Sequence, residues 1–244
     1  APALIAYATA LLNRIGLDAD KAAVVAAILV EADLLGHTTH GLALLAPYLG
    51  ELEKGAMAKT GEPRVVADFP AALTRDGGRL PGPWLVTRAL DAAIPRAKTY
   101  GTCTVVIRRS HHIACLAAYL QRVTDQGLMA LLSCSDPIVA SVAPYGGRVA
   151  RYTPNPIAAA WPTASDPVIL DVSMSITTNA LTNRLTKEQR RFPGPWALDS
   201  SGNATDDPAA SGRPVTPSSP TRLASNTLPA IAAARMSARV SSAS

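Results

Sequence analysis

Histidines are the residues of this 244-residue sequence best suited to chemistry near neutral pH. All four lie in two pairs, His37 with His40 and His111 with His112, where one regular segment of the chain gives way to another. Imidazole exchanges a proton close to pH 7, so such pairs on loops are candidates for general acid–base catalysis. They are also candidate metal ligands, but the sequence has no HExxH pattern or facial-triad spacing, so no metal site is expected.

Other familiar catalytic signatures are missing from the sequence. It contains no GxGxxG or GxxxxGK[ST] pattern for phosphate binding and no GxSxG nucleophile elbow. The three cysteines, Cys103, Cys115 and Cys134, have neither CxxC nor zinc-type spacing. A Rossmann-type site, a P-loop, a disulfide framework and a structural zinc are therefore disfavoured.

The composition allows a large apolar core and gives little reason to expect nucleic acid or a membrane as a partner. Apolar residues make up 48% of the chain, yet no uncharged apolar run is long enough to cross a bilayer. The net charge of +5 depends on four arginines after residue 210, and the preceding residues are nearly neutral. The scattered cysteines and the lack of a signal-peptide pattern predict a cytoplasmic location.

Hydrophobic periodicity predicts an α/β protein whose histidine pairs lie between regular elements. Gly16 is expected to end the first helix and Asp18 to cap the second. Helical spacing predicts helices over 3–15, 19–34, 42–55, 84–98 and 113–126. Apolar and β-branched runs predict strands at 65–67, 71–74, 102–107, 128–132, 157–161 and 168–172.

Three parts of the chain differ in character. Residues 1–62 are predicted to be helical, and residues 63–210 alternate between helix and strand. Residues 211–244 are rich in Ser and Pro and contain no acidic residue. Because such a composition buries little apolar surface, we expect this last part to be disordered.

A series of short motifs resembles the malate/L-lactate dehydrogenase family of NAD(P)-dependent oxidoreductases, which is unrelated to the Rossmann-type lactate dehydrogenases. The motifs cover about residues 1–210, and their shared order makes the resemblance specific. They are Glu31-Ala32-Asp33, Thr39-His40-Gly41, Arg109-Ser110-His111-His112, Ser135-Asp136-Pro137, Pro144-Tyr145-Gly146-Gly147, Thr153-Pro154-Asn155-Pro156-Ile157-Ala158, Leu170-Asp171-Val172-Ser173, Trp196-Ala197-Leu198-Asp199 and Thr205-Asp206-Asp207-Pro208.

The resemblance implies hydride transfer between NAD or NADP and a small-molecule 2-hydroxy or 2-oxo acid. By match to the family, His112 would be the acid–base group, with His40 beside the substrate and the Thr39 hydroxyl as a hydrogen-bond partner. From spacing alone, Asp171 would be interpreted as the cap of a strand-end turn. The cofactor-binding residues implied by the resemblance, within the part 63–210, are Ser135, Asp136, Asn155, Asp171, Val172 and Ser173.

The implied fold is a non-Rossmann α/β fold, with a mostly antiparallel sheet and flanking helices, in a homodimer whose clefts are shared between subunits. Leu44 stands where many members have an arginine that pairs with the substrate carboxylate. This difference favours a less charged 2-oxo compound over malate or lactate. The family's lysine-containing C-terminal segment has no match in residues 211–244. We therefore expect a truncated or frameshifted chain, incomplete at the C-terminus, with a catalytically impaired remnant that keeps only the folding core or dimer surface as the alternative function.

Overall fold

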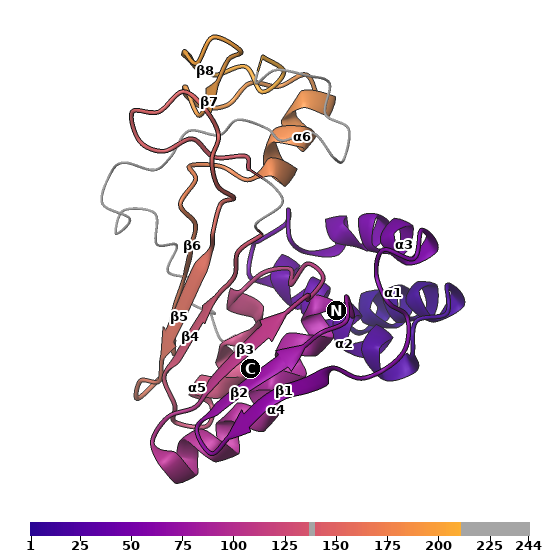
Figure 1. Ribbon diagram of the computed structural model, residues 1–244. Helices are drawn as coiled ribbons and strands as arrows, with labels where there is room; N and C mark the ends of the chain where they lie inside the picture. The colour runs from indigo at the N-terminus through magenta and orange to yellow at the C-terminus, as the bar shows by residue number, and fades with distance from the viewer. Residues whose placement is uncertain (137–139, 211–244) are drawn as a thin grey trace. The chain divides into compact units, whose positions relative to one another are not determined.

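The chain folds into two compact units of mixed α/β structure, as the computed structural model shows for residues 1–136 and 140–210 (Figure 1). Within these residues, the first unit contains 1–130 and 159–169, and the second contains 131–136, 140–158 and 170–210. The predicted α/β class is confirmed. The predicted three-part division of the chain stays a prediction, and its last part lies outside the described residues.

Most predicted elements are present, while α6, β7 and β8 are additions that hydrophobic periodicity does not predict. The helices, with short 3-10 helices written η, are α1 (Pro2–Arg14), α2 (Ala19–Leu34), η1 (Leu42–Leu44), α3 (Leu45–Glu53), α4 (Gly82–Tyr100), η2 (Ala117–Tyr119), α5 (Gln121–Thr124) and α6 (Asn179–Lys187). The strands are β1 (Arg64–Phe69), β2 (Ala72–Asp76), β3 (Thr104–Arg108), β4 (Ala130–Ser133), β5 (Ile157–Trp161), β6 (Val168–Val172), β7 (Ala197–Leu198) and β8 (Ala204–Thr205). Among the described residues, every helix is too short or too polar to cross a bilayer.

Helices α1, α2 and α3 share one apolar core. Leu12, Leu29 and Leu52, one from each helix, are completely withdrawn from solvent in it. Burying a leucine side chain stabilises a fold by about 1.5–3 kcal/mol, so this cluster is the main source of stability for the helical part. Leu44 packs against the same cluster, half-buried.

The turn between α1 and α2 confirms one sequence prediction and corrects another. Gly16 follows α1 with φ at +91°, a conformation that favours glycine, and its N–H donates to the Asn13 carbonyl. Asp18 does precede α2, but its side chain caps no backbone group. The carboxylate instead accepts a 2.8 Å hydrogen bond from Lys21 Nζ, because that buried ammonium needs a charged partner.

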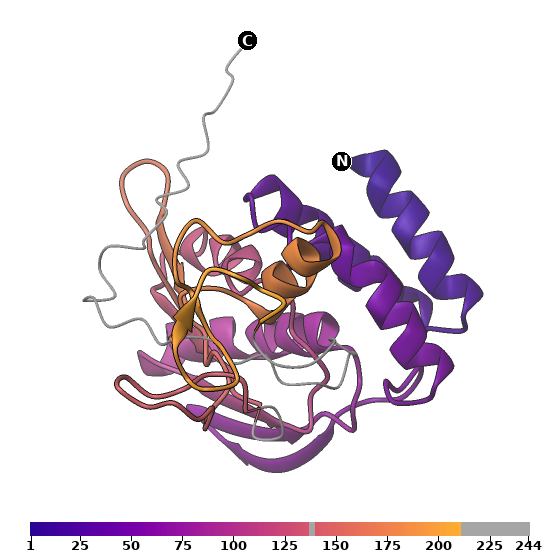
Figure 2. The same cartoon turned by 90° about the horizontal axis from the view of Figure 1, so that it is seen from above.

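Strands β1, β2 and β3 form a small sheet in the first unit, with β1 antiparallel and β3 parallel to the central β2. Helix α4 lies along one face of this sheet, as Figure 2 shows from above. Ile107 of β3 packs against Trp84 and Leu85 of α4 on that face. This packing fixes the carboxyl end of β3, and therefore the position from which residues 109–112 continue.

A row of charged residues crosses the carboxyl ends of β2 and β3. Register pairs Asp76 with Arg64 on one side and Arg108 on the other. The Asp76 side chain is only 2% exposed, and it accepts hydrogen bonds from Arg109 Nε at 2.7 Å, Arg108 Nε at 3.2 Å and Arg64 Nη2 at 3.4 Å. The hydrogen bond from Arg109 is the largest cause that lowers the pKa of Asp76, to about 2.

Residues 113–126 differ from the single helix that their periodicity predicts. Only η2 and α5 are helical there, while residues 113–116 are irregular. Ala114 has φ at +58°, outside the range of a right-handed helix, and the Tyr119 hydroxyl donates to the Ile113 carbonyl. The helical spacing is present, but contacts of the segment after His112 override it.

The second unit contains short elements with a small core of their own. Strand β7 pairs with β8 in antiparallel fashion, and Leu185 and Phe192 pack together with Ala197. Helix α6 begins after Thr178, whose hydroxyl accepts a hydrogen bond from the N–H of Leu181 at 3.1 Å. A third sheet has the strand order β4-β5-β6.

Replacing Asp76 with Asn tests the charged row through its pH dependence. The native carboxyl titrates near pH 2 and the ordinary value is 3.8, so its stabilising effect is full above about pH 4 and is lost as the pH falls toward 2. We expect the urea midpoint of the D76N variant to be lower than that of the original chain at pH 5 and the difference to shrink by pH 2.5. The exposed Asp125→Asn variant is the control, and an unchanged difference across that range would contradict the assignment.

Candidate active site

Two histidines that are far apart in the sequence lie side by side in the first unit. His40 follows the end of α2, and His112 follows β3. Their rings stack with centroids 5.8 Å apart and an angle of 24° between planes. The structure therefore brings together the two histidines that the sequence analysis selects.

The ring of His112 is held by two donors at the same nitrogen. The buried Tyr48 hydroxyl lies 2.8 Å from His112 Nδ1, and the backbone N–H of Ala114 donates to that nitrogen at 3.1 Å. A backbone N–H can only donate, so Nδ1 is the unprotonated nitrogen and the neutral ring carries its proton on Nε2. Burial raises the pKa of Tyr48, so its hydroxyl keeps its proton.

The pKa of His112 is lowered by its surroundings. Desolvation is the largest cause, followed by the positive charges that His40 and His111 can carry. Although the residue as a whole is exposed to solvent, its Nδ1 is contacted by Tyr48 and Ala114. At pH 7 the ring is neutral and carries one proton that it can donate from Nε2.

The residues around His40 give a physical reason for the Thr-His-Gly motif. Thr39 Oγ1 lies 2.9 Å from His40 Nδ1. The Asp33 carboxylate accepts a hydrogen bond from the N–H of Leu42 at 2.9 Å, which ties the turn back to α2. A Cβ at Gly41 would lie only 2.7 Å from Asp33 Oδ2, so a side chain there would displace the carboxylate that holds this turn.

Three further residues belong to the histidine cluster: His111, which the sequence analysis names only as one of a pair, and Tyr48 and Glu51, which it did not select. His111 Nε2 lies 3.6 Å from Glu51 Oε2, and burial is the largest cause that lowers the pKa of His111. The Tyr48 ring meets the rings of His111 and His112 edge-on, at 6.0 and 5.9 Å. Tyr48 and Glu51 are three positions apart on α3, so they share one face of it. That spacing is a weak signal, because Tyr48 also fits the apolar stripe of the helix.

Residues implied to bind the cofactor meet in the second unit, where the ends of three strands come together. Cys134 follows β4, and its N–H donates to the carbonyl of Pro156, which precedes β5. Burial is the largest cause that raises the pKa of Cys134 to about 11, and the charges of Asp171 and Asp136 add to it. Two more of the implied residues lie at these strand ends: Ser135 follows β4, next to Asp136, and Val172 is the last residue of β6.

The segment after β6 is tied to the loop that contains Asn155. The N–H of Met174 donates to the Pro154 carbonyl at 2.8 Å, and Asn155 Nδ2 lies 3.7 Å from Met174 Sδ. Ser173 Oγ donates to the Ser175 carbonyl at 3.1 Å. Within the described residues, Asn155 Oδ1 is a buried acceptor without a hydrogen-bond partner. Hydroxyl and amide groups of a nicotinamide nucleoside would satisfy such an acceptor, so this loop fits the implied cofactor.

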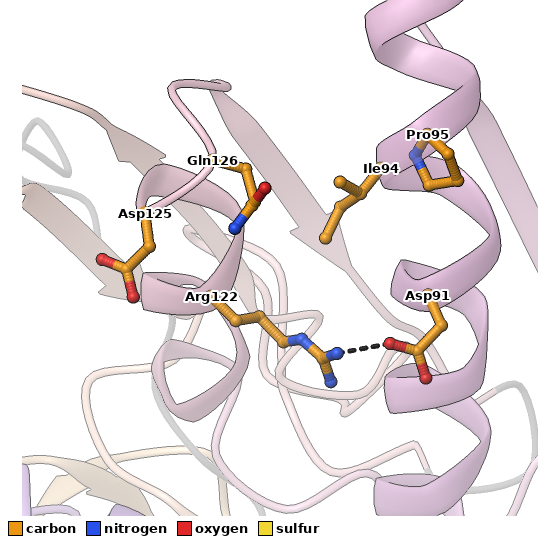
Figure 3. Close-up of a pocket in the computed structure, with 6 residues that line it drawn as sticks. All are labelled: Asp91, Ile94, Pro95, Arg122, Asp125 and Gln126. Carbon is orange, nitrogen blue, oxygen red and sulfur yellow. Dashed lines mark hydrogen bonds and ion pairs between the residues drawn. The ribbon is translucent and has the colours of Figure 1, made fainter.

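An open pocket between α4 and α5, also in the first unit, is separate from the histidines. It has a volume of about 340 Å³, and an ion pair between Arg122 and Asp91 lies across it (Figure 3). Its lining residues are Asp91, Ile94, Pro95, Arg122, Asp125 and Gln126. None of these residues belongs to the histidine cluster.

Comparisons with known proteins find similarity to one family of dehydrogenases. The sequence profile of a family described as malate/L-lactate dehydrogenase matches residues 1–218. The (2R)-3-sulfolactate dehydrogenase (NADP(+)) of Chromohalobacter salexigens is 33% identical over 206 residues, which are 83% of this chain and 60% of that protein. The ureidoglycolate dehydrogenase (NAD(+)) of Escherichia coli O157:H7 is 31% identical over 82% of this chain and 57% of its own length.

A solved structure shows the same fold. The dehydrogenase from Sinorhizobium meliloti superposes with a TM-score of 0.82 at 30% identity, over 92% of this chain and 63% of that one. The chain thus spans about 60% of the length of the relatives it matches.

Removing the imidazole of His40 tests the electrostatic part of the cluster. A positive His40 beside His112 disfavours a second positive ring, so the His40→Asn variant should raise the pKa of His112. Imidazole nitrogen chemical shifts, followed by NMR against pH, report both the titration and the nitrogen that carries the proton. The matched control is His37→Asn, which should leave the His112 titration in place. Equal titrations of His112 in the H40N variant and the original chain would refute the coupling.

Proposed function

Because the chain belongs to the malate/L-lactate dehydrogenase family, we propose that it transfers a hydride between a nicotinamide cofactor and a 2-hydroxy or 2-oxo acid. The observation that carries this proposal is the stacked pair His40–His112, with His112 fixed by Tyr48 and Ala114. Such a transfer needs a group that holds or moves the proton of the substrate oxygen. The neutral His112 ring is supported in that role by its position and its tautomer.

In the proposed reaction, His112 Nε2 faces the substrate oxygen. When bound, a nicotinamide cofactor would supply or accept the hydride. With Nδ1 occupied by the Ala114 N–H, the proton on Nε2 is available for donation to the carbonyl oxygen of a 2-oxo acid, where negative charge develops. The His40 ring stacks on His112 and is hydrogen-bonded to Thr39, so this pair would orient a substrate held beside His112.

The residues around Leu44 bear on the class of substrate. Leu44 is half-buried against the helical core and offers no charge. A substrate carboxylate would lack a guanidinium partner at this position. We therefore propose a 2-oxo compound less charged than malate or lactate as the substrate.

We propose that the cofactor binds at the strand ends of the second unit. Asp171 and Ser173 would form hydrogen bonds with ribose hydroxyls, and Asn155 Oδ1 would accept a hydrogen bond from the nicotinamide nucleoside. The rest of the cofactor site would be lined by Ser135, Asp136 and Val172. The names of the two relatives specify NADP(+) for one and NAD(+) for the other, so both cofactors are tested here. Saturable fluorescence titration of the 244-residue chain with NADH and with NADPH tests binding, and no saturation with either one would contradict this proposal.

Two further features of the proposal come from the family resemblance. We propose a homodimer and a cytoplasmic location. Light scattering on the purified chain tests the first, and fractionation of the source cells tests the second. A monomer at working concentration would contradict the homodimer without affecting the assignment of the histidines.

Replacement of His112 tests the proton-transfer role. The His112→Ala variant should lower the rate of hydride transfer by about 10²–10⁴-fold and leave cofactor affinity nearly unchanged, because the imidazole acts on the substrate oxygen. Single-turnover absorbance of the reduced cofactor measures the rate, and fluorescence titration measures the affinity. His37→Ala is the matched control and should retain the original rate. Unchanged turnover in H112A would remove His112 from the mechanism and favour His40.

A further inference from the structure

The segment that leads from β3 to the histidines runs along the connection between β2 and α4. The N–H of Gly77 donates to the Arg108 carbonyl at 2.8 Å, and the N–H of Arg79 donates to the Arg109 carbonyl at 2.7 Å. The N–H of His111 then donates to the Leu80 carbonyl at 3.1 Å. These bonds continue the pairing of the two strands beyond their ends and bring the histidines to the start of α4.

Gly82, the first residue of α4, lies directly against the backbone of both histidines. It is buried, and a Cβ at this position would lie 2.5 Å from the His111 carbonyl oxygen and 2.6 Å from the His112 carbonyl carbon. The same Cβ would come closer still to the His112 carbonyl oxygen. All three atoms belong to the backbone, so no flexible side chain can move aside to make room.

Close approach, and not backbone conformation, requires glycine here. The φ angle of Gly82 is outside the left-handed region, so an L-residue could adopt it. Gly77 makes a milder contact of the same kind upstream, where a Cβ would lie 3.2 Å from the Arg109 carbonyl oxygen. At Gly77 and Gly82, the connection between β2 and α4 thus packs against the segment that contains the histidines through backbone atoms alone.

We infer that Gly82 is a positioning residue for His112, an inference that rests on the proposed function for its catalytic consequence. His112 is held from two sides, with its carbonyl group against Gly82 and its Nδ1 against the Tyr48 hydroxyl at 2.8 Å. A methyl group at residue 82 pushes the His112 backbone away from α4. The imidazole then moves with respect to Tyr48 and His40, although neither of those residues is changed.

The Gly82→Ala variant tests this inference through turnover. A displacement of about 1 Å at a reacting group can cost about 10²-fold in rate, so we expect kcat to fall by about 10- to 100-fold. The KM for the cofactor should change by less than about twofold, because the strand ends that would hold it belong to the other unit. Gly50→Ala is the matched control, since Gly50 lies within α3 and a Cβ there meets no atom within 4 Å.

An NMR readout that does not depend on activity separates this inference from the proposed function. In G82A the nitrogen shifts of the His112 ring should lose the signature of a hydrogen-bonded Nδ1, while G50A keeps it. If the original chain shows no turnover but G82A still alters the ring signal, the proposed function fails and the positioning role stands. A folded G82A variant with the original ring signal and the original kcat overturns the inference.

Gly77→Ala provides a second variant in case G82A does not fold. Its methyl would meet the tip of Leu85, which can move, and the Arg109 carbonyl oxygen, which must give by a few tenths of an ångström. We expect a smaller change in the same ring signal and a smaller loss of kcat. A folded G77A variant with neither change would overturn the role of the β2–α4 connection in placing His112.

Discussion

The hydrogen bond between the Tyr48 hydroxyl and His112 Nδ1 connects two parts of the chain that are 64 residues apart. Tyr48 is buried in the core of the three N-terminal helices, whereas His112 extends from a strand of the β1–β2–β3 sheet. Because Tyr48 is fixed in the helical core, this bond also fixes the position of the His112 ring, which follows β3. A buried hydroxyl must find a partner, so this bond satisfies Tyr48, while the N–H that Ala114 donates to the same nitrogen fixes the tautomer of His112. The proposed chemistry depends on that choice of nitrogen.

Charge is distributed differently around the histidines and around the nearby charged row. At His111 and His112, burial is the largest cause that lowers the pKa and favours a neutral ring. At Asp76, three guanidinium groups surround one carboxylate and favour its charged form. Arg109, which helps to hold Asp76, precedes His111 by two residues. The charged row thus anchors the segment in which His111 and His112 lie without placing a charge in the histidine cluster itself.

Several elements could be predicted from local pattern because short-range physics decides them. Gly16 ends α1 because it can adopt a positive φ, and the β-branched run before Arg108 forms β3 because it is buried against α4. Residues 113–126 could not be predicted in this way. Their helical spacing is real, but Ala114 takes a positive φ so that its N–H can reach the ring of His112. The hydrogen bond from Ala114 to the His112 ring outweighs the local preference for a helix.

The sequence by itself determined the α/β class and the family, and it predicted His40 and His112 as site residues, because the order of the motifs and the chemistry of the residue types can be read without the tertiary structure. Tertiary structure alone decided that these two rings stack, that Tyr48 and Glu51 join them, and that Leu44 packs with the helical core. It also decided why Gly41 and Gly82 are glycines, since the carboxylate of Asp33 and the carbonyl groups of two histidines occupy the space of a side chain. Such contacts join residues remote along the chain, and no local spacing encodes the distance between them.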